Sequence, residues 1–135
     1  MNDNLTGSCL CELVSYQFNQ PALKMGICHC RDCQKWTGCA AKPYLVFPAD
    51  AMQVTGDVKF YTKFSARGSQ ASRGFCVNCG GEVYAKSTGY PGIVIISAGT
   101  LDNPELFKPS VEIFTDSACH WSLFLGDTDK FLAYP

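Results

Sequence analysis

The chain has 135 residues, of which 47% are hydrophobic and 17% charged, and this composition excludes an intrinsically disordered segment. Its 11 basic and 12 acidic residues give a net charge of -1, so we expect neither nucleic acid nor an anionic membrane as a partner. The length suits one domain over residues 1–135. The start lacks the pattern of a signal peptide, and the longest apolar run, at 93–98, is too short to span a bilayer, so we expect a cytoplasmic protein.

We expect a mainly β fold of packed antiparallel sheets with a few short helical turns. The first predicted element is one extended strand over 10–18, joined by a turn at 19–21 to a partner strand over 22–27. Further strands are predicted between glycine and proline breaks, at 40–47, 53–55, 58–64, 70–75, 82–86, 93–98 and 110–115. Helical turns are predicted at 32–37, 48–52 and 104–107, the first of them ended by Gly38.

Nine cysteines stand out, and seven of them form three short groups. In a reducing compartment, grouped cysteines indicate metal ligands rather than disulfides. Cys9 and Cys11, two apart in an extended strand, would point to the same face. Cys76 and Cys79 form a C-x-x-C turn, and the glycines after it let backbone N–H groups turn toward the sulfurs. These four thiolates predict a closed tetrahedral structural zinc site; a redox dithiol at 76–79 is the alternative, and Gly80-Gly81 argues against the helix that it needs.

The second group places Cys28, Cys30 and Cys33 within one short segment. Three ligands leave a tetrahedral metal one open position, which a catalytic zinc keeps for water or substrate. His29 is the candidate fourth ligand, but in an extended segment it would point away from its neighbours, which favours a surface or supporting role. A redox pair at Cys30 and Cys33 is a further alternative, although the interleaved Cys28 suits a metal better.

Several other side chains are candidates for the site or its surroundings. Asp32 is predicted to cap the following helical turn, and Cys39 to be buried. His120 is a candidate acid or base, with a packed or exposed histidine as the alternative. Residues 58–81 carry no acid and four basic side chains, which form either a solvated strand face or an anion-binding rim: Lys59, Lys63, Arg67 and Arg73.

The order of these motifs resembles the glutathione-dependent formaldehyde-activating family, which also includes centromere protein V. The resemblance rests on G-S-C-L-C at 7–11, C-H-C-R-D-C-Q-K-W-T-G at 28–38, R-G-F-C-V-N-C-G at 73–80, S-A-G-T-L-D at 97–102, I-F-T at 113–115 and Trp121. It implies a β-tent fold and a carbon–sulfur lyase that reversibly adds glutathione to formaldehyde, giving S-hydroxymethylglutathione. Small-molecule thiol and aldehyde substrates are thus the expected partners.

The same resemblance implies two zinc ions, one structural on the first four cysteines and one on Cys28, Cys30 and Cys33. A bound metal could deliver a substrate thiolate or act as a Lewis acid on the aldehyde carbonyl. Three thiolates would leave the second ion with a net negative charge, which favours thiolate delivery and predicts a labile zinc. Arg73, which precedes the C-x-x-C turn, is the first candidate to bind a glutathione carboxylate.

Two departures from the family pattern concern the pocket rather than the ligands. Gly81 stands where the family often has threonine or serine, and His120 where it often has proline. The competing hypothesis is a non-catalytic binding module with both zincs structural, because a fold does not determine a function. An open coordination position on the second metal would distinguish the enzyme from the module.

Overall fold

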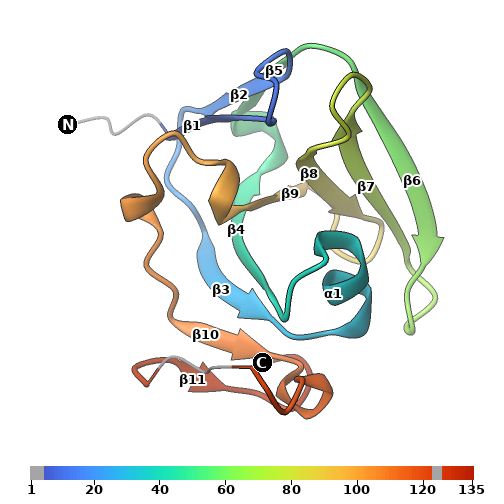
Figure 1. The fold of residues 1–135 in the computed structure, drawn as a ribbon, viewed down its shortest axis with the longest axis vertical. Helices are drawn as coiled ribbons and strands as arrows, with labels where there is room; N and C mark the ends of the chain where they lie inside the picture. Colours follow the sequence, from blue (N-terminus) through green and yellow to red (C-terminus); the bar gives the residue numbers. More distant parts are fainter. Residues whose placement is uncertain (1–4, 123–125) are drawn as a thin grey trace.

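The computed structural model describes residues 5–122 and 126–135, which form two β-sheets and one short α-helix (Figure 1). The smaller sheet is antiparallel, in the order β1-β2-β5, and consists of β1 (Leu5–Ser8), β2 (Ser15–Phe18) and β5 (Met52–Thr55). The helix, α1 (Arg31–Thr37), ends at Gly38, which adopts the left-handed conformation that a side chain disfavours. Gly38 therefore ends the helix as predicted.

The larger sheet has the order β11-β10-β3-β4-β9-β8-β7-β6. Its strands are β3 (Lys24–Cys28), β4 (Lys42–Pro48), β6 (Val58–Phe64), β7 (Gln70–Cys76), β8 (Glu82–Ser87), β9 (Ile93–Ser97), β10 (Val111–Ile113) and β11 (Asp129–Lys130). Four 3-10 turns connect elements within the described segments: η1 (Ala49–Ala51), η2 (Ala98–Thr100), η3 (Pro104–Leu106) and η4 (Thr115–Ser117). In Figure 1, α1 lies between the ends of β3 and β4 and the long β6–β7 hairpin.

One apolar core joins the two sheets. Along β2 the side chains alternate between exposed and buried, as expected for a strand with one solvated face. The buried ring of Phe18 stacks on the ring of Phe47 from β4, with centroids 3.7 Å apart. Full burial of an aromatic side chain of this size stabilises a fold by about 1.5–3 kcal/mol. The small sheet is therefore held against the large one by apolar packing.

The prediction of one strand over 10–18 is wrong. Residues between β1 and β2 form a turn, in which the N–H of Cys9 donates to the carbonyl of Val14 at 3.0 Å. Glu12 has a positive φ of 67° inside this turn, which an extended strand cannot contain. The predicted hairpin of 10–18 with 22–27 is also wrong, because β2 pairs with β1 and β5 while β3 pairs with β4 and β10.

The mainly β prediction is confirmed, and the other predicted strands and helical turns are present with small shifts at their ends. The exclusively antiparallel expectation needs one correction, since β10 pairs in parallel with both β3 and β11. In the described part of the chain, no helix has the length and apolar character needed to cross a lipid bilayer.

Candidate metal centres

The first centre lies where two turns meet at one end of the molecule. Cys9 and Cys11 belong to the turn between β1 and β2, whereas Cys76 ends β7 and Cys79 lies in the turn between β7 and β8. The four sulfur atoms lie within 4.8 Å of one another. The sequence pairs were therefore correctly grouped, although a turn rather than a strand aims Cys9 and Cys11 at one point.

Sulfur separations in this group fit a tetrahedral metal. The Sγ of Cys11 lies 3.7 Å from that of Cys9 and 3.7 Å from that of Cys76. A tetrahedral zinc with Zn–S bonds of about 2.3 Å would hold its sulfurs about 3.8 Å apart. The side chains are therefore already arranged as a closed ligand shell.

Backbone N–H groups point at these sulfurs. Val14, Asn78 and Gly81 donate to the sulfurs of Cys9, Cys76 and Cys79 at 3.4, 3.3 and 3.4 Å, respectively. Gly80 has a φ of 74°, which lets the chain turn back toward the cysteines. N–H groups of Cys11 and Gly81 lower the pKa of Cys79 to about 6, because they stabilise its thiolate. Cys79 thus favours the thiolate form that binds metals.

The second centre lies where β3 passes into α1. Cys28 is the last residue of β3, Cys30 is the N-cap of α1, and Cys33 lies in the first helical turn. The three sulfurs lie within 4.8 Å of one another. The N–H of Cys33 donates to the sulfur of Cys30 at 3.3 Å, so the ligand segment and the helix start are one motif. Among the residues that the structure describes, no fourth histidine, cysteine or carboxylate joins this group.

Charge is concentrated on one thiol of this centre. Hydrogen bonds from Cys28 and Cys33 lower the pKa of Cys30, and the positive charge of Arg73 acts in the same direction. The pKa of Cys28 is raised, because its hydrogen bonds with Cys30 and Cys33 and its burial favour the protonated thiol. Three thiols that share protons in this way can exchange those protons for one cation.

His29 points away from the three sulfurs, as the sequence analysis favoured. Its side chain is 1% exposed, and its Nε2 lies 2.9 Å from Oε1 of Glu112 on β10. Glu112 is fully buried and also accepts hydrogen bonds from Thr128 and from Lys130. This buried network fastens the cysteine segment to β10 and β11 and gives His29 a supporting role.

Two cations lie near the second centre and beside one aromatic ring. The Nζ of Lys42 lies 4.2 Å from the ring centroid of Trp36, and the guanidinium carbon of Arg73 lies 5.6 Å from the same centroid. Lys42 is opposite Cys28 in the β3–β4 register and is only 4% exposed. Burial lowers the pKa of Lys42, and the negative charge of Glu82 opposes that shift.

The basic side chains of residues 58–81 have different surroundings. Lys63 donates to Asp32 on α1 at 2.8 Å, and the guanidinium of Arg67 lies 3.7 Å from the ring centroid of Tyr134. Arg73 is half-buried and lies on the same face of the hairpin as Lys63. Arg73 pairs with Tyr61 across the two strands, and Lys63 follows Tyr61 by two residues in β6, so the three side chains share one face. The prediction that Asp32 caps the helix is wrong, since the sulfur of Cys30 takes that place.

Two more predictions concern residues near α1. Cys39 is exposed rather than buried, because it follows the glycine that ends the helix. His120 is exposed, while its neighbour Cys119 donates to Oε1 of Gln34 at 3.2 Å and brings this late segment against α1. The acid–base role of His120 stays a prediction.

An open cavity of about 460 Å³ lies beside the first centre. Leu10, Gly81, Glu82 and Asp102 contribute to its lining. A Cβ atom at Gly81 would lie 3.3 Å from the sulfur of Cys79 and 3.3 Å from the backbone nitrogen of Leu10. The glycine therefore leaves open a space that a threonine or serine would partly fill.

Similarity to known proteins extends over most of the chain. A model of the family described as glutathione-dependent formaldehyde-activating enzyme matches residues 4–117. The chain belongs to this family. Over 125 residues it is 28% identical to a protein named an uncharacterised lyase from Schizosaccharomyces pombe, covering 93% of this chain and 88% of the relative.

A solved structure supports the fold of this family member. The crystal structure of a Rhodobacter sphaeroides protein superposes with a TM-score of 0.59 at 20% identity. The superposition covers 77% of this chain and 96% of that protein. At this identity the likeness concerns the fold alone.

The sequence analysis missed Lys42 and Glu112. Lys42 is a charged residue at the start of an otherwise apolar strand, and that contrast is the signal that could have identified it. Glu112 lies between valine and isoleucine in β10, which is a similar signal. In both cases, a charge in a buried strand indicates a specific partner or a function.

Proposed function

We propose that this protein is a zinc-dependent carbon–sulfur lyase that adds a small-molecule thiol, such as glutathione, to formaldehyde or a related small aldehyde. The observation that carries the proposal is the convergence of three sulfurs at the junction of β3 and α1, with His29 bonded to Glu112 instead. Membership of the family and a relative named a lyase support a reaction of this class. The cytosolic location expected from the sequence stays a prediction.

Both cysteine groups fit zinc by the chemistry of their donors. Cys9, Cys11, Cys76 and Cys79 would hold a structural ion, because four thiolates close its shell. Cys28, Cys30 and Cys33 would hold the second ion. When bound there, zinc would supply a Lewis acid and a position at which a substrate thiol loses its proton readily.

The surrounding residues would position the two substrates. Arg73 would bind a carboxylate of the thiol substrate, since guanidinium groups pair well with carboxylates and Arg73 is half-buried beside the centre. Both Arg73 and Lys42 lie near the ring of Trp36, which would form an apolar wall beside the bound thiol. Burial of Cys28 would keep bulk water from the reacting atoms and so strengthen these electrostatic contacts.

The binding-module alternative requires a fourth protein ligand on the second metal. His29 was its best candidate, and its Nε2 is directed to Glu112. In the described parts of the chain the group contains three residues, which favours the enzyme over the module.

The proposal is tested by the exchange of ¹³C-formaldehyde between its free form and its glutathione adduct, followed by NMR. The metal-replete protein should accelerate exchange above the spontaneous rate, and Cys28→Ser should abolish the acceleration. Cys39→Ser is the matched control, because Cys39 is an exposed cysteine outside both groups and this variant should keep the full rate. Spontaneous exchange alone in the wild type would exclude this thiol–aldehyde pair.

A further inference from the structure

Lys42 is a buried basic residue whose side chain makes few polar interactions with its surroundings. It is 4% exposed, and its ammonium lies over the ring of Trp36. Among residues 5–122 and 126–135, no hydrogen bond or ion pair engages this ammonium, and its one cation–π contact is with Trp36. Burying a lysine in this way costs free energy that paired lysines recover.

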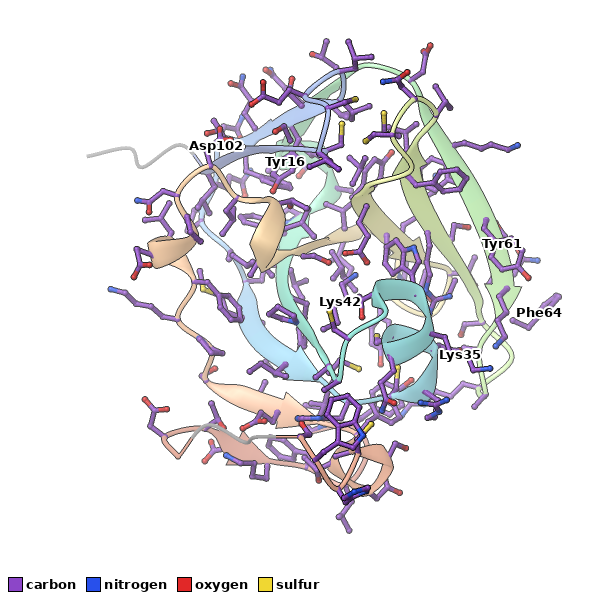
Figure 2. The ribbon with its side chains drawn as sticks, in the orientation of Figure 1. Tyr16, Lys35, Lys42, Tyr61, Phe64 and Asp102 are labelled. Carbon is purple, nitrogen blue, oxygen red and sulfur yellow. The ribbon has the colours of Figure 1, made fainter. Side chains whose placement is uncertain are left out.

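The position of Lys42 is fixed by the sheet. It pairs with Cys28 in the antiparallel β3–β4 register, and side chains of such pairs lie on the same face. Burial lowers the pKa of Lys42 and the positive charge of Arg73 acts in the same direction, whereas the negative charges of Glu82 on β8, Cys33 and Cys28 favour the ammonium. Figure 2 shows Lys42 in the interior beside α1, whereas Lys35 extends from the outer side of that helix.

Glu82 does not neutralise Lys42 by direct contact. Its Oε2 accepts a hydrogen bond from Ser97 at 2.8 Å, and its Oε1 is buried without a hydrogen-bond partner among the described residues. The carboxylate therefore favours a positive charge at Lys42 from a distance and leaves the N–H groups of the ammonium available. An available donor beside the three sulfurs is suited to an oxygen atom of a substrate.

We propose that Lys42 is a catalytic residue whose ammonium donates a hydrogen bond to the carbonyl oxygen of the aldehyde while the thiolate adds to the carbonyl carbon. This inference rests on the proposed function. The sulfur electron pair forms the new carbon–sulfur bond, and the carbonyl π pair moves to oxygen as an alkoxide. The alkoxide takes up one proton from water. The thiol has released one proton to water, so the step leaves the number of protons unchanged. Lys42 stabilises the oxygen as its charge develops.

Arg73 is less suited to this role. It is half-buried and lies farther from Trp36 than Lys42 does, at 5.6 Å against 4.2 Å. The two cations would thus divide the substrates between them: Arg73 would bind the carboxylate of the thiol, and Lys42 the oxygen of the aldehyde. Loss of Lys42 should therefore lower kcat, and loss of Arg73 should raise the KM for the thiol.

The test compares Lys42→Met with wild type in exchange kinetics, metal content and thermal unfolding. Methionine fills a similar volume without a charge. We expect a fall in kcat of about 100-fold or more, as for the loss of one oxyanion donor, with KM for glutathione changed less than about threefold. Metal content should be unchanged, and Tm should be equal or higher, because a buried unpaired charge has been removed. Lys35→Met is the control and should match wild type in every respect.

A second variant keeps the test decisive if Lys42→Met folds poorly. Lys42→Ala should be restored in part by added ethylammonium, which can occupy the vacated space and donate to the same oxygen. Wild-type activity in a folded Lys42→Met protein would overturn this inference and leave the proposed function intact. The same conclusion would follow if Lys42→Met were inactive because it had lost the second metal. A wild type that holds both metals but accelerates nothing would overturn the proposed function, and with it this role.

Discussion

The Nε2 atom of His29 lies 2.9 Å from Oε1 of Glu112, and this buried contact ties the segment of the three cysteines to β10. Replacing Glu112 by alanine should destabilise the fold by about 1–3 kcal/mol, because the buried side chains of His29 and Thr128 would lose a hydrogen-bond partner. Urea unfolding at neutral pH measures the change. Glu105→Ala, at an exposed site, should stay within about 0.5 kcal/mol of wild type. Equal stability of the two variants would show that the buried network contributes little.

Gly80 gives the first centre a conformation that other residues resist. Its φ is 74°, so Gly80→Ala should destabilise the protein by about 1–2 kcal/mol. Gly99→Ala is the matched control: Gly99 does not have a positive φ, and a Cβ there would meet nothing within 4 Å. Thermal unfolding of the metal-loaded proteins should rank Gly80→Ala below wild type and Gly99→Ala at or above it. The reverse order would contradict the turn geometry.

Much of the candidate site could be predicted because its signals are local. The spacing of Cys28, Cys30 and Cys33 places three thiols in one segment whatever the rest of the chain does. The same holds for the C-x-x-C turn at 76–79, whose glycine conformation the structure confirms. Strands such as 58–64 were predicted correctly, since β-forming residues between turn residues depend little on distant partners.

What the sequence could not show depends on distant pairing. The parallel register of Val111 with Gly26 joins segments that are far apart in the chain and leaves no local pattern. The strand over 10–18 was wrong for a related reason, because the turn that presents Cys9 and Cys11 overrides their neighbours' preference for strands. Lys42 became a candidate only when the β3–β4 register placed it opposite Cys28.

Arg73 should affect binding of the thiol more than the chemical step. Arg73→Ala should raise the KM for glutathione about tenfold or more, with little change in kcat, because a charge-assisted hydrogen bond to a carboxylate is lost. Lys59→Ala, an exposed cation on the same hairpin, is the control and should leave both constants unchanged. The assay is initial-rate exchange at varied glutathione concentrations. An unchanged KM in Arg73→Ala would remove it from the thiol site.

The first centre should be structural. Cys11→Ser should lose the metal of that centre and unfold at a much lower temperature, since structural zinc contributes on the order of 10 kcal/mol to the folding of zinc-finger peptides. Cys39→Ser should keep both the metals and the wild-type Tm. Elemental analysis and circular dichroism on the same preparations measure the two effects. A stable Cys11→Ser protein without that metal would contradict the assignment.

The most direct test of the account is whether a substrate thiol joins the metal held by Cys28, Cys30 and Cys33. Cobalt replaces zinc in such sites, and its absorption from sulfur-to-metal charge transfer increases with each added thiolate. In the cobalt-loaded wild type, glutathione should increase this absorption to saturation, and in Cys28→Ser it should not. If the absorption of the fully cobalt-loaded wild type did not change when glutathione was added, that result would contradict an open metal centre and favour the binding module.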